Sequence, residues 1–496
     1  MIKASTYPAA LCKPQLLHTC IRVSALFLLL IAWGNMFQSE SKQAYAQTQV
    51  RLLFTESLRG ETTELGRVRI LRGNVEMETD DLHILADSVY QYLDRNFIDA
   101  FGNIQIRTEN QHIWADTLRY NTLTDISRFR GRVVVEGPSA RLFSQEMLYN
   151  FIFEIAEFPR QIRMEDENGT LQADRGFYFS LPDSAAFYGN VQIADATQYA
   201  EADTLYAVRS ADFFKMRGNV YLEDFEERTR MRGGFSQSDS TGFRELRDHA
   251  RLQRVNEART DTTFLAADRI EVTNRDTLST VDGFGNVEIW AERYAALSEQ
   301  STYNDQTGLF RLTGDARLWQ KDLQLSGETI DIQLIDDEIE SLFAFPEPVA
   351  VTPDSLTGRF NQIIGDSLRI YFDAGEISKM RVEPNSEMII HERDENDRPE
   401  FAIQISAERL IMHFNEGNID SLKYYRTIDG RYIPEALNPG EIRLQGFQYE
   451  PERRPAKPAE WLFPSRDPIP EEPLFPLPRR NREFLDEQDI SAIEPE

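Results

Sequence analysis

The sequence predicts an elongated all-β protein built from stacked variants of one 29-residue unit. Two short phrases return along the chain at that spacing, and apolar residues alternate with a period of two beside them. Period two is the pattern of a strand with one buried face, and no stretch beyond residue 46 keeps a 3.6-residue apolar period over a dozen residues. The 496 residues, 41% of them hydrophobic and 27% charged, suffice for one long body or two to three ordinary domains.

The first phrase is a glycine, a polar residue and an apolar residue. Its first five glycines lie 29, 29, 58 and 29 residues apart, and the skipped copy survives without its glycine as Pro159-Arg160-Gln161-Ile162. The series loosens at His249-Ala250-Arg251-Leu252 and then resumes. The copies are Gly73-Asn74-Val75, Gly102-Asn103-Ile104, Gly131-Arg132-Val133, Gly189-Asn190-Val191, Gly218-Asn219-Val220, Gly285-Asn286-Val287 and Gly314-Asp315-Ala316.

The second phrase follows about fourteen residues later and places an acidic residue after a small one and before a polar and an apolar residue. One carboxylate per unit at a constant phase invites a catalytic or metal interpretation. A structural hydrogen bond to a turn explains the same regularity, and we favour it. Copies include Ala86-Asp87-Ser88-Val89, Ala115-Asp116-Thr117-Leu118, Ala202-Asp203-Thr204-Leu205, Ala267-Asp268-Arg269-Ile270 and Gly365-Asp366-Ser367-Leu368.

The repeated glycine lies inside a strand pattern, where it weakens a strand unless the backbone bends. We therefore predict that it marks the corner at which a strand crosses from one sheet to the facing sheet. A unit with one apolar face must stack on its neighbours, so the repeats should enclose a continuous apolar interior between two sheets. The edges at the ends of such a stack predict docking of other proteins by strand addition and head-to-tail self-association.

The two ends of the chain differ in composition from the repeats. Residues 1–46 carry basic residues, an apolar run from Val23 to Trp33 and a small-residue triplet ending at Ala46, which predicts a secretory signal peptide. A first repeat region, 47–245, and a second, less regular one, 246–450, follow. Ten of the 22 prolines lie in 451–496, which predicts a disordered tail. The apolar clusters of that tail could bind a partner or fold back on the repeats.

Charge and side-chain chemistry exclude several classes of function. Acidic residues outnumber basic ones, 82 against 54, so nucleic acid is not an expected partner. The histidines after residue 46 are scattered, and no phosphate-binding loop is found, so we predict no catalytic residues, no metal site, no cofactor and no enzyme. The alternative is a glycosidase-type carboxylate pair, for which the irregular spacings around His249 and between Glu347 and Asp366 are the places to look.

The phrases resemble those of the OstA-like family, the organic-solvent-tolerance-like N-terminal domains related to the periplasmic lipopolysaccharide-transport protein LptA. The segments that carry the resemblance are Leu71-Arg72-Gly73-Asn74-Val75, Ala100-Phe101-Gly102-Asn103-Ile104-Gln105-Ile106 and Ala115-Asp116-Thr117-Leu118-Arg119-Tyr120. The resemblance implies a β-jelly roll of stacked antiparallel strands, V-shaped in section, that holds the acyl chains of lipopolysaccharide. It also implies a periplasmic location, association with the outer membrane and other envelope transport proteins as partners.

An interior that holds acyl chains needs a continuous apolar groove, in which burial contributes about 0.8 kcal/mol per methylene. Lipopolysaccharide or another acylated glycolipid is therefore the expected ligand, in a protein of lipopolysaccharide transport and outer-membrane assembly. The alternative is a structural or adhesive envelope protein with a dry, filled core and no lipid ligand. The predicted groove residues are Ile104, Ile106, Leu118, Val133, Val135, Val191, Ile193, Leu205, Val220, Leu222, Val287 and Ile289.

Overall fold

The computed structural model describes residues 50–78, 82–108, 111–137, 140–167, 169–179, 184–256, 261–275, 278–336, 338–415, 418–458, 469 and 474–475. The predicted signal peptide, 1–46, lies outside the described residues, as does most of the predicted tail. Within these ranges no helix is long and apolar enough to cross a membrane.

Thirty-two strands form one antiparallel sheet that continues along the molecule. The first half of the series is β1 (Arg51–Phe54), β2 (Ser57–Thr63), β3 (Gly66–Glu78), β4 (His83–Tyr92), β5 (Phe97–Arg107), β6 (His112–Asn121), β7 (Ile126–Glu136), β8 (Ala140–Asn150), β9 (Ile155–Phe158), β10 (Ile162–Asp166), β11 (Gly169–Ala173), β12 (Arg175–Phe179), β13 (Ser184–Asp195), β14 (Gln198–Val208), β15 (Phe213–Asp224) and β16 (Thr229–Ser238).

The second half is β17 (Phe243–Val255), β18 (Thr262–Arg275), β19 (Leu278–Trp290), β20 (Ala295–Asn304), β21 (Leu309–Gln320), β22 (Leu323–Ile335), β23 (Glu338–Phe345), β24 (Val349–Asp354), β25 (Arg359–Ile364), β26 (Leu368–Asp373), β27 (Glu376–Val382), β28 (Ser386–Arg393), β29 (Pro399–Ala407), β30 (Arg409–Asn415), β31 (Asn418–Tyr425) and β32 (Asp429–Pro434). Four short 3-10 helices complete the described elements: η2 (Arg209–Ala211), η3 (Glu435–Leu437), η4 (Pro439–Glu441) and η5 (Pro451–Arg453).

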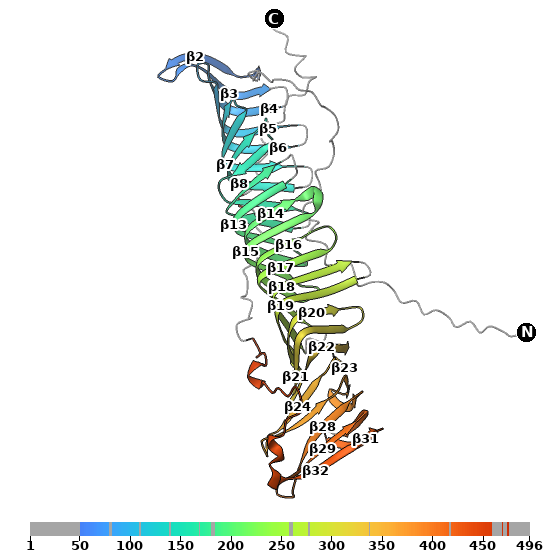
Figure 1. Cartoon of the computed structure of the whole chain (residues 1–496). Coiled ribbons are helices and arrows are strands. Elements are labelled where there is room, and N and C mark those ends of the chain that lie inside the picture. Colours follow the sequence, from blue (N-terminus) through green and yellow to red (C-terminus); the bar gives the residue numbers. More distant parts are fainter. Residues whose placement is uncertain are drawn as a thin grey trace, which may run out of the picture.

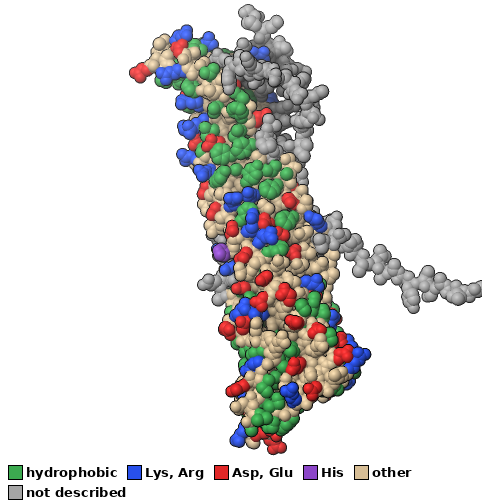
Figure 2. All heavy atoms as spheres, viewed as in Figure 1, with side chains coloured by type: hydrophobic (Ala, Val, Ile, Leu, Met, Phe, Trp, Pro, Cys, Tyr) green, Lys and Arg blue, Asp and Glu red, His purple; other side chains and the backbone are tan. Residues whose placement is uncertain are grey.

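The strands stack along one long axis, with β2 at one end of the body and β32 near the other (Figure 1). Most strands pair with the strands before and after them in sequence, because short turns join them into hairpins. In the same view, hydrophobic side chains gather over the upper strands, whereas acidic and basic side chains mix over the middle and lower strands (Figure 2). The predicted elongated all-β stack of antiparallel strands from a 29-residue repeat is confirmed.

The long strands that carry the first phrase bend at its glycine, and the bend divides each of them into two halves. Gly102 and Asn103 both have positive φ, 78° and 46°, and the pairing register shifts between Phe101 and Ile104. A left-handed Gly-Asn pair inserted into a ladder is a bulge that turns the strand. The predicted corner is confirmed, and the halves on its two sides form two arms: residues 97–101 of β5 belong to the first arm and 104–107 to the second.

The acidic residue of the second phrase fastens the corner of the next strand. Asn103 donates a 2.8 Å hydrogen bond to the Asp87 carboxylate, and the same contact recurs from Asn190 to Asp174, from Asn219 to Asp203 and from Asn286 to Asp268. A Cβ at Gly102 would overlap the Asp87 carboxylate, so both the positive φ and the close approach call for glycine. The structural interpretation of the repeated carboxylate is confirmed.

The alanine before each acidic residue has a packing role. Ala86 pairs with Val75, Ala115 with Ile104, and Ala202 with Val191, so a small side chain stands beside the apolar residue that follows each corner. The two arms converge at the corner, where room is least. The two sequence phrases are therefore neighbours in space: the glycine phrase forms the bend, and the acidic phrase of a neighbouring strand supplies the carboxylate and the small side chain that pack against it.

Beyond β22 the bent strand gives way to two separate strands. β22 pairs with β23 on the first arm and with β24 on the second, and from there each arm is a ladder of its own. The first-arm ladder is β23, β26, β27, β30 and β31, and the second-arm ladder is β24, β25, β28, β29 and β32. The predicted division at 245/246 falls within β17 and remains a prediction.

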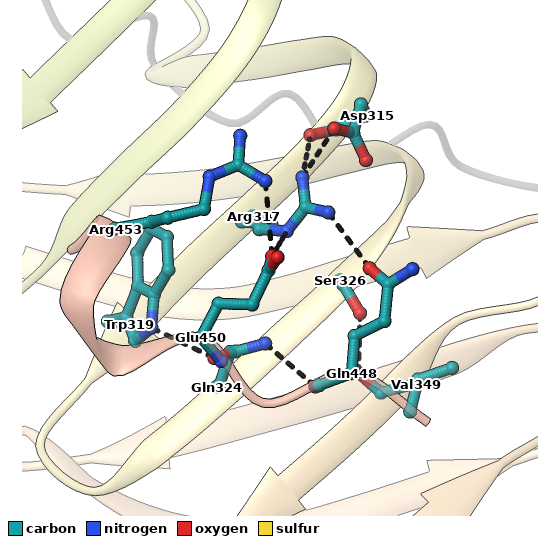
Figure 3. Close-up of polar contacts among 9 residues, drawn as sticks. All are labelled: Asp315, Arg317, Trp319, Gln324, Ser326, Val349, Gln448, Glu450 and Arg453. Atoms are coloured by element: carbon teal, nitrogen blue, oxygen red, sulfur yellow. Dashed lines mark hydrogen bonds and ion pairs between the residues drawn. The ribbon is translucent and has the colours of Figure 1, made fainter. Parts of the chain in front are cut away.

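After β32 the chain turns back across the outer side of the second arm; we call residues 435–458 the strap. Leu444 is buried against Ile389 and Ala402, and its backbone N–H bonds the side chain of Gln362. Farther along, Glu450 forms a 2.7 Å ion pair with Arg317, and Gln324 donates to the backbone carbonyl of Gln448 (Figure 3).

The strap continues into the segment that was predicted to be disordered. Lys457 pairs with Glu292 at 2.7 Å and stands over the Trp290 ring, so 451–457 lie against the body. Leu474 and Phe475 pack on a small outer cluster formed by Trp114, Val134 and Phe143. The cluster that contains Leu474 and Phe475 therefore folds back on the repeats, which is one of the two alternatives for the tail. Apart from Pro458 and Ile469, the remaining tail residues lie outside the described ranges.

Candidate functional site

One apolar core runs between the two arms from Leu71 to Met412. Inward side chains from both arms belong to it, so the interior is continuous over almost every described strand. The repeated units supply it with side chains of similar size at similar depth. On the first arm these include Val89, Phe129, Phe187 and Leu246, each no more than 1% exposed.

The predicted groove residues all reach this interior. Ten of them are fully buried, and Val135 and Leu222 are half-buried and pack against the same core. Ten lie on the second arm, just after a corner, whereas Leu118 and Leu205 lie on the first arm. The prediction that they line an open groove stays a prediction, because the core packs closely around most of them.

A cavity of about 410 Å³ opens between the arms at β14–β22, within the ~300–1,000 Å³ range of small-molecule sites. Its second-arm wall comes from β14–β18 and from Tyr294 in the turn between β19 and β20, and its first-arm wall comes from β17–β22. Of the twelve predicted groove residues only Leu222 lines it. The apolar lining is Tyr199, Ala200, Leu222, Met231, Leu252, Val255, Leu265, Val272, Val281, Tyr294, Tyr303, Phe310 and Leu334.

Sequence reasoning missed most of this lining. Val281 and Phe310 stand on inward positions of their strands, and strand alternation alone could have marked them as candidates. No sequence signal shows that residues some 50 to 110 positions apart, such as Leu222 and Leu334, face one space. The irregular spacing around His249 lies in this part of the chain, but His249 itself forms a corner, with φ of 63°.

Charged side chains surround the mouth of the cavity, which lies between the ends of the two arms, opposite the corners. The lining includes six carboxylates, Glu223, Asp224, Glu226, Glu227, Asp261 and Asp305, against three guanidinium groups, Arg228, Arg244 and Arg254. Burial raises the pKa of Asp224, even though the backbone N–H groups of Glu226 and Glu227 donate to its carboxylate at 3.0 and 2.8 Å. Apolar walls with a charged rim suit an amphiphile.

Ion pairs join the two arms across the open side. Arg254, at the end of β17 on the second arm, contacts Asp305, at the tip of the first arm, with 3.1 Å between Nη1 and Oδ1. Arg293 and Glu338 form a second such pair at 2.8 Å, and Lys321 with Glu376 a third. These three pairs bridge the opening at points between β17 and β27.

The described residues hold no group of three or more His, Cys, Asp or Glu side chains arranged to bind a metal ion. The repeated carboxylates are engaged at corners, as the Asn219 bond to Asp203 illustrates. Arg132 replaces asparagine at one corner, and its hydrogen bonds to Asp116 lower the pKa of that carboxyl. The predictions of no catalytic residue and no cofactor remain predictions.

Comparison with protein families places these repeats. Residues 47–204 match the family described as OstA-like protein, and residues 255–338 match the family described as LptA/(LptD N-terminal domain) LPS transport protein. Two stretches of the chain are therefore similar to the OstA-like and the LptA/(LptD N-terminal domain) families. The two matched regions lie on either side of β15–β16, and the second includes part of the cavity.

No curated protein sequence matches this chain. Among solved structures, LptH from Pseudomonas aeruginosa, the LptA-homologous periplasmic component of its lipopolysaccharide transport device, is similar with a TM-score of 0.23 and 10% identity. That comparison covers 28% of this chain and 95% of LptH.

Proposed function

We propose that this chain is a periplasmic, non-enzymatic protein of lipopolysaccharide transport and outer-membrane assembly that holds acyl chains between its two arms. The observation that carries the proposal is the continuous apolar core with a cavity that opens between the arms and has apolar walls and a charged rim. Acyl chains need apolar surface without directional contacts, and a stack of similar units offers similar surface at successive positions. The two family matches support the assignment to lipopolysaccharide transport.

The ends of the stack support a role for partners. At one end β2 pairs with β3, and Leu58 is 57% exposed; at the other end β32 pairs with β29, and Tyr432 is 63% exposed. Strand edges with exposed apolar side chains favour strand addition. Other envelope transport proteins, or a second copy of this chain in a head-to-tail arrangement, are the proposed occupants, with the outer membrane as the destination.

The function is tested by filling the cavity. Leu222→Phe adds volume on the cavity wall, where an open space accepts it, so we expect near-normal thermal stability and reduced loading of acylated glycolipid. Val134→Phe is the matched control, because Val134 lies on the outer side of the second arm beneath Leu474 and Phe475. Its overpacking should cost roughly 1–3 kcal/mol of unfolding free energy and leave lipid loading unchanged.

The measurements are melting temperature and lipid bound to the purified full chain. A dry, filled core, as in a structural or adhesive envelope protein, would make Leu222→Phe destabilising. If the unaltered chain also bound no acylated glycolipid, the proposed function would be wrong.

A further inference from the structure

The outer side of the second arm is more deeply buried than the outer side of the first arm. Val220 and Leu222 of β15 pack in the core, so Tyr221 between them points outward, yet Tyr221 is only 1% exposed. On the first arm the outward side chains of Phe101 and Tyr206 are each 41% exposed. Outward side chains on a sheet face that meets water stay accessible, so the difference indicates that the second arm is covered on this side.

The buried outer side extends over several strands. Phe264 of β18 points outward beside the core residue Leu265 and is 7% exposed. Arg163 of β10, which pairs with Glu165 at 2.5 Å, also points outward and is 3% exposed. An ion pair on an open sheet face keeps one side in water, so this degree of burial indicates cover here too. We call the outward positions of the second arm from β10 to β18 the outer face.

Described parts of the C-terminal segment lie at both ends of the outer face. Lys457 stands over the ring of Trp290 on β19, and Phe475 packs on Phe143 of β8 with 5.7 Å between ring centroids. Ile469 lies between these two anchors in the sequence and is 9% exposed. An isoleucine in a segment that stood away from the body would be exposed to water, so the burial of Ile469 indicates that the segment lies against the protein.

The chain between the anchors is long enough to follow the outer face. The second-arm ladder runs β8, β10, β11, β13, β14, β15, β16, β17, β18 and β19, which spans about 43 Å at roughly 4.8 Å per pairing. Five of the sixteen residues 458–473 are proline, which favours an extended polyproline II chain. At about 3.1 Å per residue, the chain from Lys457 to Phe475 reaches roughly 56 Å.

We propose that the outer face is a docking surface for residues 459–473 of the same chain. Proline-rich segments bind surfaces lined by aromatic side chains, and the outer face offers Tyr221 and Phe264. The segment brings an apolar cluster of its own, Trp461-Leu462-Phe463. Strands β14–β18 also form the second-arm wall of the cavity, so the docked segment lies behind that wall. This surface is separate from the interior, and the inference does not depend on the proposed function.

The test is limited digestion of the full chain with a glutamate-specific protease, with cleavage after Glu460 and Glu471 followed by mass spectrometry. Glu395, in an exposed turn between β28 and β29, is the reference site. Proteases cut a docked segment only when it opens, so cleavage after Glu460 and Glu471 should be at least roughly tenfold slower than after Glu395.

The variant that weakens the outer face is Tyr221→Ala, and the matched control is Tyr206→Ala, which removes the same outward side chain from the first arm. Cleavage after Glu460 and Glu471 should become roughly three- to tenfold faster in Tyr221→Ala and stay unchanged in Tyr206→Ala. Melting temperatures establish that each variant is folded at the temperature of digestion.

A second variant, Leu474→Ser with Phe475→Ser, removes one anchor and alters no strand. It should speed cleavage after Glu471 by at least roughly tenfold and leave cleavage after Glu395 unchanged, whether or not Tyr221→Ala folds.

Three outcomes would overturn the proposal. One is cleavage after Glu460 and Glu471 as fast as after Glu395 in the unaltered chain. Another is equal acceleration in Tyr221→Ala and Tyr206→Ala. The third is protection that disappears on dilution, which would place the segment on a second copy of the chain. Protection that is independent of concentration and lost in Tyr221→Ala and the anchor variant supports docking within one chain.

Discussion

Two parts of this molecule build the same pair of arms in different ways. From β3 to β22 most strands stay whole and bend at a corner, whereas from β23 to β32 each arm has its own strands. Prolines lie at several breaks: Pro346 and Pro348 between β23 and β24, Pro384 between β27 and β28, and Pro159 between β9 and β10 in the first part. Proline has no backbone N–H to donate to a ladder, so a strand ends where proline occupies the corner.

The side chains that fasten the corner persist across both parts. At the break between β27 and β28, Pro384-Asn385 stands where the first part has Gly-Asn, and Asn385 has φ of 57°. Its amide donates a 3.0 Å hydrogen bond to Asp366, as Asn103 does to Asp87. The comparison teaches that the asparagine–aspartate contact, rather than an unbroken strand, keeps the two arms together.

The largest loss of stability is expected when a side chain is added to the corner glycine of an unbroken strand. Gly218 has φ of 74°, and a Cβ there would overlap the Asp203 carboxylate. Gly218→Val should lower the free energy of unfolding by about 3 kcal/mol, from backbone strain and overpacking together. Urea denaturation measures the change.

The control for this exchange comes from the split part. Gly430 in β32 has no positive φ, and a Cβ there would make only an ordinary 3.8 Å contact with Ile405. Gly430→Val should therefore stay within about 0.5 kcal/mol of the unaltered chain. Equal losses at the two glycines would show that the corner makes no special demand.

A smaller, shared effect is expected from the corner carboxylates. Asp203→Ala and Asp366→Ala each remove the acceptor of an asparagine amide, one in each part of the molecule. Each should lower the free energy of unfolding by about 1–2 kcal/mol, because hydrogen bonds to charged groups are the stronger ones. Glu395→Ala, at an exposed turn, is the control, and thermal unfolding is the measurement. A loss confined to Asp203 would contradict a common corner chemistry.

The smallest expected effects concern the pH dependence of stability, which has opposite sign for one buried group in each part of the molecule. Burial raises the pKa of Asp224, so the stability linked to this carboxyl is present below its unfolded pKa of about 3.9 and is lost as pH rises. Asp224→Asn should therefore melt at a slightly higher temperature than the unaltered chain at pH 7, and the advantage should vanish near pH 3.5. If Asp224→Asn still melted at a higher temperature near pH 3.5, the added stability would not come from removal of the carboxylate charge.

In the split part, burial lowers the pKa of His391, which is only 7% exposed. A neutral imidazole is favoured in the folded chain, so the linked stability is present above the unfolded pKa of about 6.5 and is lost as pH falls through it. The drop in melting temperature between pH 7.5 and 5.5 should be smaller in His391→Gln than in the unaltered chain. If the melting temperature fell equally in His391→Gln and in the unaltered chain, protonation of His391 would not be the cause of the fall.

The sequence by itself determined the strands, their 29-residue repeat, the glycine corner and the structural use of the repeated carboxylate. These features depend on contacts between neighbouring strands: Asp87 and Asn103, for example, are 16 residues apart, and the same contact recurs at separations of 16 to 19 residues. Alternation and a short repeat can be recognised in a sequence because the residues that contact one another lie within one repeat or in the next one.

Only the tertiary structure determined which residues far apart in the sequence contact one another. The strap reaches from Gln448 to Gln324, 124 residues away, and the ion pair across the mouth joins Arg254 to Asp305. The cavity is lined by strands β14 to β22, which belong to different repeats and face one another across the space between the two arms. Such contacts carry no period, since they depend on the twist and spacing of the whole stack, and a single sequence holds no signal of that geometry.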